Sequence, residues 1–592
     1  MTALIPLVVL VPLLGAALAL ALPGRRRAQQ VITVAALAIV LAIAIAFMVV
    51  VDAYGTLVMQ VGGWAAPFGI SLVVDRLSAL MLAVSAIVLL GVLLFSLGQG
   101  LADGDDETPV SIYYPTYLVL GAGVCNAFIA GDLFNLYVGF EILLVASYVL
   151  ITLGGTGPRI RAGVTYVVVS LVSSILFLAS IALVYAAAGT VNLAQLTLRL
   201  AELSDGIQLI LNLMLLIAFG IKAAVFPLAF WLPDSYPTAP APVTAVFAGL
   251  LTKVGVYAMI RTQTQLFPDS PLDDMLMTIA ALTLLVGILG AVSQLDIKRL
   301  LSFTLISHIG YLVFGIAMAD AAGYTATIYY IAHHIIVQTT LFLAVGLVER
   351  QGGTTSLTEL GGMLRAAPVV AVLFFIPMLN LGGIPPFSGF IGKLGLFEAA
   401  AEQATPAGYW LIGVGALVSL LTLYALARTW SLAFWRSRAA ALGGPAVPQP
   451  TTTEGMMLQG REAALLERLH DAPHAQPRQE QRDTPRLMVG ATAAMVAVSI
   501  ALTVFAGPLY RYASHAGEEL TEPMRLVEQV LGSDADQDLG PGHGGGSGTT
   551  EPEGSAPEHS GQGKSRQGES GSEGSGSEHS GSHESDGGGG SS

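Results

Sequence analysis

Three lysines stand inside long apolar runs of this 592-residue chain: Lys222, Lys253 and Lys393. The chain has only five lysines, and its other basic residues are mostly arginines in the polar segments between such runs. Arginine stays protonated at any accessible pH, whereas an ammonium group removed from water releases its proton far more readily. A buried lysine can therefore carry protons where a buried arginine cannot. The alternative is a span-end lysine that reaches the lipid headgroups, but an ionisable residue within a membrane is first a functional hypothesis.

Glu141 lies in the apolar run DLFNLYVGFEILLVASYVLI and is the only glutamate near the middle of such a run. An isolated carboxylate there must be neutral or paired. Lys222 is its predicted partner, because a nearby carboxylate favours the ammonium form and desolvation opposes it. Moving the two groups together or apart would then control when the lysine holds its proton. The sequence alone leaves open whether they are in contact.

Two adjacent histidines occur in another apolar run, YYIAHHIIVQTTLFL. His333 and His334 lie about 100° apart around a helix, so we expect at most one to face a shared axis squarely. His334 is one turn from Gln338, and imidazole can relay protons near neutral pH. We therefore place His334 on a proton path, with His333 and Gln338 as secondary candidates. His308, in SFTLISHIGYL, is a weaker candidate, because it is also typical of a hydrogen-bonded interior residue.

Membrane helices must position these groups. Hydrophobic residues make up 54% of the chain and charged residues only 11%, a composition that no soluble domain of this length shows. Apolar stretches long enough to cross about 30 Å of hydrocarbon predict an all-α polytopic membrane protein with about fourteen spans. The expected spans begin near residues 2, 31, 70, 112, 132, 162, 207, 240, 275, 300, 325, 367, 408 and 487. Asp132, Asp234 and Asp296 lie near span ends, where helix capping or interface contacts explain them at least as well as chemistry does.

Two of the expected spans are interrupted by prolines, in IKAAVFPLAFWLPDSYPTAPAPV and in MLNLGGIPPFSGFIGK. Each break frees backbone groups that lipid cannot satisfy, so it must be buried in protein or line a watery cavity. A pair of broken spans, one in each half of a chain, is typical of a transporter's ion path. Each break also lies close to a lysine, since Lys222 precedes Pro227 and Lys393 follows Pro386.

Basic residues in short loops predict the orientation. With fourteen spans, the basic loops all fall on the cytoplasmic side, at 25–27, 159–161, 298–299, 350–365 and about 436–486. Both termini are then predicted to be external. We expect the following organisation: N-terminal transmembrane helices over 1–111, a core over 112–436, a cytoplasmic arginine-rich loop over 437–486, a last transmembrane helix over 487–508, and an acidic, mostly disordered tail over 509–592.

The net charge of −14 is concentrated in that tail, which has fifteen acidic against four basic residues from Arg511 onward. Residues 533–592 have almost nothing apolar to bury and are expected to be disordered, and the irregular spacing of their histidines is more typical of a solvated tail than of a metal site. Cys125 is the only cysteine, which excludes a disulfide within the chain. No cofactor or metal motif is present, and no basic patch interleaved with aromatic residues supports nucleic-acid binding.

Several motifs together resemble a known superfamily. FPLAFWLPDSYPTAPAPVTAVFAGLLTKVGVYAMIR, the preceding Lys222, SHIGY and IPPFSGFIGK closely resemble the antiporter-like proton-translocating subunits shared by respiratory complex I and the Mrp-type cation/proton antiporters. The resemblance covers roughly residues 70–436. Within the superfamily, DLFNLYVGFEILLVASYVLI and the lysine of the twelfth span are most similar to the D-type subunit of the multisubunit Mrp Na+/H+ antiporter. It implies two inverted five-helix repeats, broken seventh and twelfth helices, and a line of charged groups halfway across the membrane.

The resemblance also implies roles for individual residues. Glu141 and Lys222 match the family's glutamate–lysine pair, Lys253 its central lysine and Lys393 its terminal lysine. Many relatives have a lysine where this chain has Gln338, so the central relay here would depend on His334 and water. The acidic tail is not part of the family pattern, and we assign it no transport role.

The sequence therefore predicts a subunit, not itself an enzyme, of a bacterial plasma-membrane Mrp-type complex that exchanges Na+ or a similar monovalent cation for protons. Its partners would be the other Mrp membrane subunits. The alternative is a proton-pumping subunit of complex I or of a membrane-bound hydrogenase. Lys393 disfavours the complex I subunit type that usually has glutamate there, but another of its subunits also has lysine. A passive channel or scaffold would leave three buried ammonium groups without a function.

Overall fold

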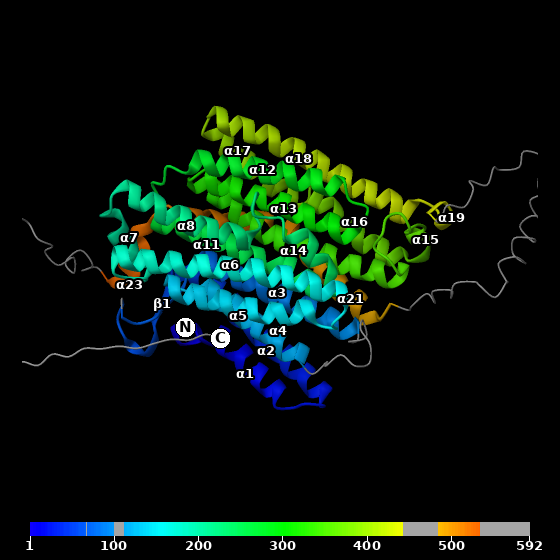
Figure 1. Cartoon of the computed structure of the whole chain (residues 1–592), viewed down its shortest axis with the longest axis horizontal. Coiled ribbons are helices and arrows are strands. Elements are labelled where there is room, and N and C mark those ends of the chain that lie inside the picture. Colours follow the sequence, from blue (N-terminus) through cyan, green and yellow to red (C-terminus); the bar gives the residue numbers. More distant parts are fainter. Residues whose placement is uncertain (67, 100–111, 442–483, 533–592) are drawn as a thin grey trace, which may run out of the picture. The chain divides into compact units, whose positions relative to one another are not determined.

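The computed structural model describes residues 1–66, 68–99, 112–441 and 484–532, which form a helical bundle with one short β-hairpin (Figure 1). The predicted tail from residue 533 and most of the predicted loop over 437–486 lie outside the described residues. Among the described residues, twelve helices are long and apolar enough to cross a membrane. Every expected span position falls in or close to a helix, but α4 and α16, with 17 and 15 residues, are shorter. The expected count of about fourteen spans is therefore not confirmed.

The N-terminal part contains the only strands of the described residues. Strands β1 (Leu57–Gln60) and β2 (Ser71–Val74) pair antiparallel, with Leu57 opposite Val74. The span expected near residue 70 therefore begins later, at Arg76, because the preceding residues are extended. The helices of this part are α1 (Leu7–Leu20), α2 (Arg26–Tyr54), α3 (Arg76–Gln99), α4 (Tyr113–Ile129), α5 (Leu133–Thr152), α6 (Gly157–Ala188) and α7 (Leu193–Ala201).

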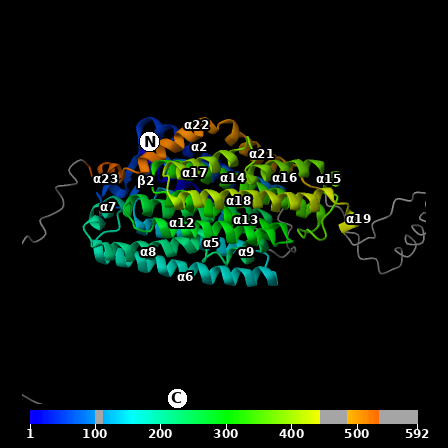
Figure 2. The same cartoon turned by 90° about the horizontal axis from the view of Figure 1, so that it is seen from above.

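The central part begins with α8 (Asp205–Ala223), which packs beside α6 (Figures 1 and 2). A continuous helix over Ala241–Leu266 joins α10 (Ala241–Val246) and α11 (Thr252–Arg261) through the π-helical turn Phe247–Leu251, and a second π turn, Thr262–Leu266, ends it. The remaining elements are α9 (Leu232–Ser235), α12 (Asp273–Val292), α13 (Ile297–Ala317), α14 (Ala321–Gly352), α15 (Met363–Ala366), α16 (Pro368–Gly382), α17 (Ser388–Glu402), α18 (Pro406–Trp430) and α19 (Arg438–Ala441).

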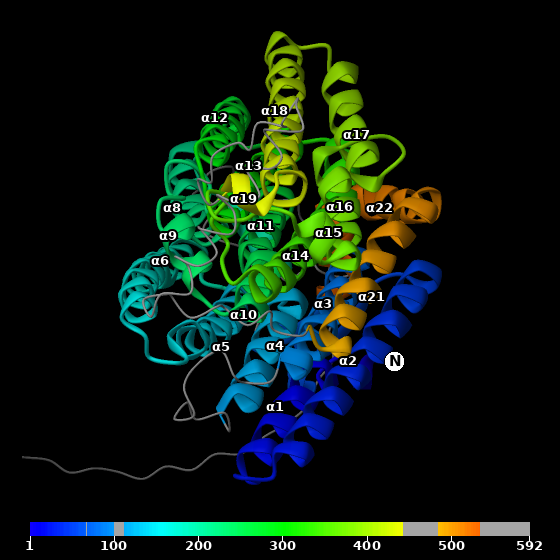
Figure 3. The same ribbon diagram turned by 90° about the vertical axis from the view of Figure 1, so that its right-hand side faces the viewer.

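Burial separates an interior from a lipid-facing exterior. The apolar stretches of the 241–266 helix and of α14 are wholly buried, whereas only a third of the stretch Thr2–Leu20, which includes α1, and of α21 (Arg486–Val504) is buried. Helix α14 packs against α3, α10, α13, α16, α17 and α21, and it lies among them in Figure 3. Polar groups on these interior helices are therefore shielded from lipid.

Both predicted helix breaks are present. Helix α8 ends at Ala223, Ala224 is left-handed with φ of 59°, and α10 begins only at Ala241. Helix α16 ends at Gly382, and α17 begins at Ser388. Protein groups satisfy the freed backbone, since the Thr283 hydroxyl accepts from Phe226 N at 3.1 Å. This agrees with the rule that irregular backbone at membrane depth must be buried in protein or line a cavity.

The C-terminal segment corrects the expected division at residue 509, which falls inside a helix. Helices α22 (Ala506–Leu520) and α23 (Pro523–Leu531) follow α21, and α22 packs against α14 whereas α23 packs against α7. The segment is acidic, but α22 places Tyr512, Ala513, Ala516 and Leu520 on a buried face. Its charge therefore marks a solvated face of a packed helix, and the acidic composition alone concealed the apolar stripe.

Two glycines of α22 test this packing. A methyl group at Gly517 would lie 2.7 Å from the Ala321 carbonyl oxygen, whereas one at Gly507 would meet nothing within 4 Å. We expect Gly517→Ala to cost about 1–3 kcal/mol through overpacking against α14. Gly507→Ala should be neutral or stabilising, because alanine is the better helix former. The measurement is the fraction of purified complex that stays monodisperse after heating, and equal stability of the two variants would contradict the docking of α22.

Candidate functional site

The first cluster joins three helices around Ser174. Its hydroxyl, on α6, donates to the Glu141 carboxylate of α5 and accepts from the Lys222 ammonium of α8 at 3.1 Å. Lys222 Nζ also lies 4.9 Å from the centroid of the Phe140 ring, a cation–π contact. No direct ion pair between Glu141 and Lys222 is present in the described part of the chain. The structure therefore brings the predicted pair together, but through an intervening hydroxyl.

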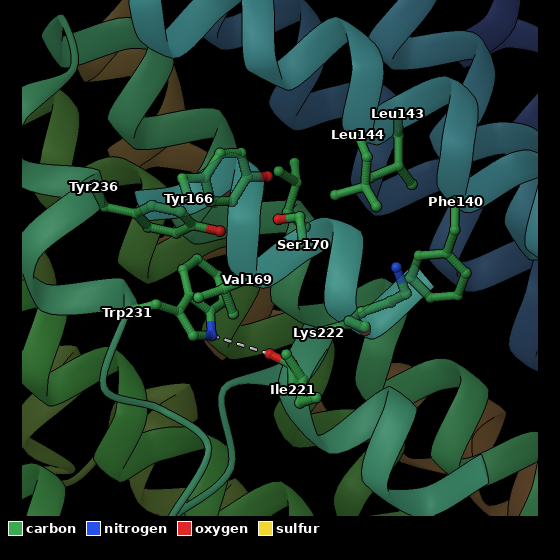
Figure 4. Close-up of a pocket in the computed structure, with 12 residues that line it drawn as sticks. Phe140, Leu143, Leu144, Tyr166, Val169, Ser170, Ile221, Lys222, Trp231 and Tyr236 are labelled. Carbon is green, nitrogen blue, oxygen red and sulfur yellow. Dashed lines mark hydrogen bonds between the residues drawn. The ribbon is translucent and has the colours of Figure 1, made fainter. Parts of the chain in front are cut away.

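A small cavity opens beside Lys222 toward the first helix break (Figure 4). Its volume is about 20 Å³, enough for one water molecule. Phe140, Ser170, Tyr166 and Tyr236 are among its lining residues, and the Tyr236 hydroxyl has no hydrogen-bond partner among the described residues. A water molecule at this place can connect the lysine with the polar groups of the break.

Lys253 is completely buried within the 241–266 helix. Its ammonium group donates to the Ala248 carbonyl oxygen at 2.7 Å, and Ala248 belongs to the π-helical turn Phe247–Leu251. A π turn changes the backbone hydrogen-bond pattern and is frequent at functional sites. The turn places a carbonyl acceptor beside this lysine, while no carboxylate of the described residues forms an ion pair with it.

The histidines form the middle of the site. The rings of His334 on α14 and His308 on α13 are stacked, with centroids 5.1 Å apart, and His308 Nδ1 is hydrogen-bonded to Tyr330 Oη at 2.7 Å. Both ring nitrogens of His334 lack a hydrogen-bond partner among the described residues. His308 is thus stacked on His334, and these two histidines together with Lys222, Lys253 and Lys393 make up the central row of buried ionisable groups.

His333 makes a hydrogen-bond contact that His334 lacks, although both rings lie against the Tyr330 ring. Its Nδ1 lies 2.9 Å from the Ser388 hydroxyl at the start of α17, and Ser388 in turn contacts Asn380 Oδ1 at 3.2 Å. The helix break between α16 and α17 is therefore tied to α14 by this histidine. Gln338 donates to the Leu301 carbonyl oxygen at 2.8 Å, so it holds α14 against α13.

Lys393 ends the row beside the second break. Its Nζ donates to the Ser419 hydroxyl at 3.0 Å and to the Leu381 carbonyl oxygen at 3.3 Å, and it lies 5.1 Å from the centroid of the Tyr311 ring. The Leu381 carbonyl belongs to the last turn of α16, where the chain leaves the helix at Gly383 with φ of 77°. The break thus supplies an acceptor for the terminal lysine.

The other candidates near span ends have the expected structural roles. Asp132 and Asp296 are N-caps of α5 and α13, accepting from Asn135 N at 2.6 Å and from Arg299 N at 2.9 Å. Asp234 forms an exposed ion pair with Arg299. Among the described residues, no group of three or more His, Cys, Asp or Glu side chains is arranged to hold a metal ion.

Comparisons with known proteins agree with this arrangement. The family model for the transmembrane region of NADH:quinone oxidoreductase and Mrp antiporters matches residues 130–422. The D-type subunit of a Na+/H+ antiporter of Alkalihalophilus pseudofirmus is 36% identical over 536 residues, which cover 90% of this chain and 100% of that protein. This chain belongs to the family of D-type subunits of Mrp Na+/H+ antiporters.

Solved structures support the same fold. A chain of the Mrp complex from Dietzia sp. DQ12-45-1b is 33% identical, with a TM-score of 0.78, over 90% of this antiporter subunit and 99% of that chain. A chain of respiratory complex I from Thermus thermophilus has the same fold at 24% identity, with a TM-score of 0.70, over 88% of this chain and 100% of that one. The identities of 36% and 33% to antiporter proteins favour the antiporter family over the complex I alternative.

Sequence reasoning missed a buried ion pair in this antiporter subunit. The Arg261 guanidinium, at the end of α11, contacts both carboxylate oxygens of Asp75 at 2.5 Å. Arg261 also donates to the hydroxyls of Ser78 and Tyr257 at 3.0 Å. Burial favours a raised pKa for Asp75, but the Arg261 charge and hydrogen bonds from Arg261 and Ser78 outweigh it and lower that pKa. The separation of 186 residues along the chain left no signal of this contact in the sequence.

This pair should be essential for the fold of the subunit. Asp75→Asn and Arg261→Met each leave one polar partner buried and unpaired, which we expect to cost about 3–5 kcal/mol and to reduce the yield of assembled complex. The Asp234–Arg299 pair is the control, because its side chains are 64% and 46% exposed rather than 6% and 8%. Arg299→Ala should cost less than about 1 kcal/mol. Thermal stability in detergent measures both, and indistinguishable losses would contradict the burial argument.

Proposed function

We propose that this chain is the proton-translocating subunit of a multisubunit antiporter that exchanges Na+ or a similar monovalent cation for protons. Lys222, Lys253, His334 and Lys393 carry the proton, and Glu141 controls the first lysine. The chain acts together with the other Mrp-type membrane subunits, and an ion gradient supplies the energy. A relative named as a Na+/H+ antiporter subunit and a structural neighbour within an Mrp complex support the assignment.

The observation that carries the proposal is the row of buried ionisable groups across the interior helices. Each lysine contacts neutral acceptors, namely a hydroxyl or a carbonyl oxygen, and lacks a direct ion pair in the described residues. A carboxylate in direct contact would favour the charged ammonium form, whereas neutral acceptors permit both the charged and the neutral form more evenly. Such groups can take up and release protons in turn.

The histidines connect the lysines. His334 and His308 are stacked between the elements that carry Lys253 and Lys393. The ring nitrogens of His334 have no partner among the described residues, so they are able to exchange protons through water. His333 is a secondary member, because its hydrogen bond to Ser388 links the row to the break beside Lys393. Gln338 has a supporting role, since it fixes α14 against α13.

Replacement of Lys222 by arginine tests the proton-carrier role. Lys222→Arg keeps the positive charge but removes the ability to release a proton, so antiport should fall to near background in assembled complex. Lys298→Arg is the matched control, because Lys298 forms an ion pair with Glu349 at 2.7 Å and needs only its charge. Antiport is measured with a pH-sensitive dye in membrane vesicles at equal amounts of complex. Full activity of Lys222→Arg would rule out the carrier role.

The proposed orientation places both termini outside the bacterial plasma membrane and the loop after α18 in the cytoplasm. In a Cys125→Ala background, a cysteine at Gln529 on α23 should react with an impermeant maleimide in intact cells. A cysteine at Ser437 should react only after the membrane is permeabilised. Both positions are exposed, so a difference in labelling reports their side of the membrane. Labelling of Ser437→Cys but not of Gln529→Cys in intact cells would reverse the topology.

A further inference from the structure

The Ser174 hydroxyl occupies the place where a direct ion pair between Glu141 and Lys222 would otherwise form. It is buried, on α6, and contacts one group on α5 and one on α8. No sequence motif pointed to this residue, because Ser174 lies 33 and 48 positions away from its two partners. The three helices meet at this one hydroxyl.

The numbers of hydrogen-bond donors and acceptors on the three groups determine which way the Ser174 hydroxyl points. An ammonium group only donates and an ionised carboxylate only accepts, whereas a serine hydroxyl has one proton to donate and two lone pairs. While Lys222 is charged, Ser174 must accept from it and is free to donate to Glu141, as observed. Once Lys222 has lost its proton, its nitrogen can also accept, so the hydroxyl can rotate and donate to the lysine instead. The orientation of the hydroxyl thus follows the protonation of the lysine.

Separation by a hydroxyl also weakens the attraction between the two charges, because Coulomb energy falls with distance. A carboxylate in direct contact would stabilise the ammonium form more strongly than one held beyond Ser174. The other titratable groups around this junction are phenols: Tyr137 and Tyr148 on α5, Tyr166 on α6 and Tyr236 after α9. Glu141 is therefore the acidic group whose distance from Lys222 matters.

We propose that Ser174 is a positioning residue that holds Glu141 and Lys222 one hydroxyl apart and thereby sets the pH range in which Lys222 exchanges its proton. The proposal rests on the proposed function, since it assigns Ser174 to the control of the first proton carrier. In its absence, the carboxylate and the ammonium move into direct contact, and the lysine keeps its proton to higher pH.

The test compares Ser174→Ala with Ser174→Thr and with Ser180→Ala. Ser180 is a buried serine on the same helix whose hydroxyl donates only to the Leu176 carbonyl oxygen, at 2.7 Å. Antiport is measured in vesicles from pH 6 to about pH 9.5 at matched amounts of complex. We expect Ser174→Ala to be about tenfold less active near neutral pH and to recover at about one pH unit higher, since one unit is a tenfold change in the deprotonated fraction. Ser174→Thr, which keeps the hydroxyl, and Ser180→Ala should retain the original profile.

A double-mutant cycle then identifies the partner. In a Glu141→Gln background, Ser174→Ala should cause no further shift of the profile, because no carboxylate remains to approach the lysine. An unshifted profile for Ser174→Ala, or a uniform loss that Ser180→Ala reproduces, would overturn the positioning role. If Glu141→Gln and Lys222→Arg nevertheless impair antiport, the proposed function still stands. Full activity of these two variants would instead defeat the proposed function itself.

Discussion

A charged group inside a membrane protein needs polar groups that replace its hydration shell. In this protein, backbone carbonyl and hydroxyl oxygens take that role by accepting hydrogen bonds from the buried ammonium groups. Lys253 uses a carbonyl within a π-helical turn, and Lys393 uses a carbonyl at the end of a broken helix together with a serine hydroxyl. The two carbonyl acceptors are available because the helices depart from regular hydrogen bonding at those positions. A regular helix in place of the π turn would leave the Lys253 ammonium group without this partner, at a cost of several kcal/mol.

The neutrality of the acceptors separates these lysines from the structural cations. Arg261 and Lys298 each contact a carboxylate directly, which suits a residue that joins two elements. Lys222 is intermediate, because its carboxylate is present but lies beyond Ser174. The same residue type can therefore fasten helices or exchange protons, according to whether its partner carries a charge.

The sequence predicted those features that depend on local composition. The two helix breaks, the three buried lysines and Glu141 could all be predicted from the sequence. Prolines and charged residues are rare within apolar runs, so each one there indicates a specific structural or functional role. Contacts between distant segments were not readable, and Ser174 and the Asp75–Arg261 pair belong to this class. A serine in an apolar helix most often bonds its own backbone, as Ser180 does, so nothing in the local pattern favoured Ser174.

For the C-terminal helices, in contrast, the composition led to a wrong prediction. Residues after 509 are acidic, and the summed charge suggested a tail, yet periodicity at the helical repeat buries one face of α22 against α14. Because α14 carries His333 and His334, α22 covers the helix on which the central row depends. Helix α22 meets α14 at Thr325 and Tyr329, so it holds in place the part of α14 that precedes the histidines. The apolar face of α22 is therefore as much a part of the candidate site's support as the helices that donate its ionisable groups.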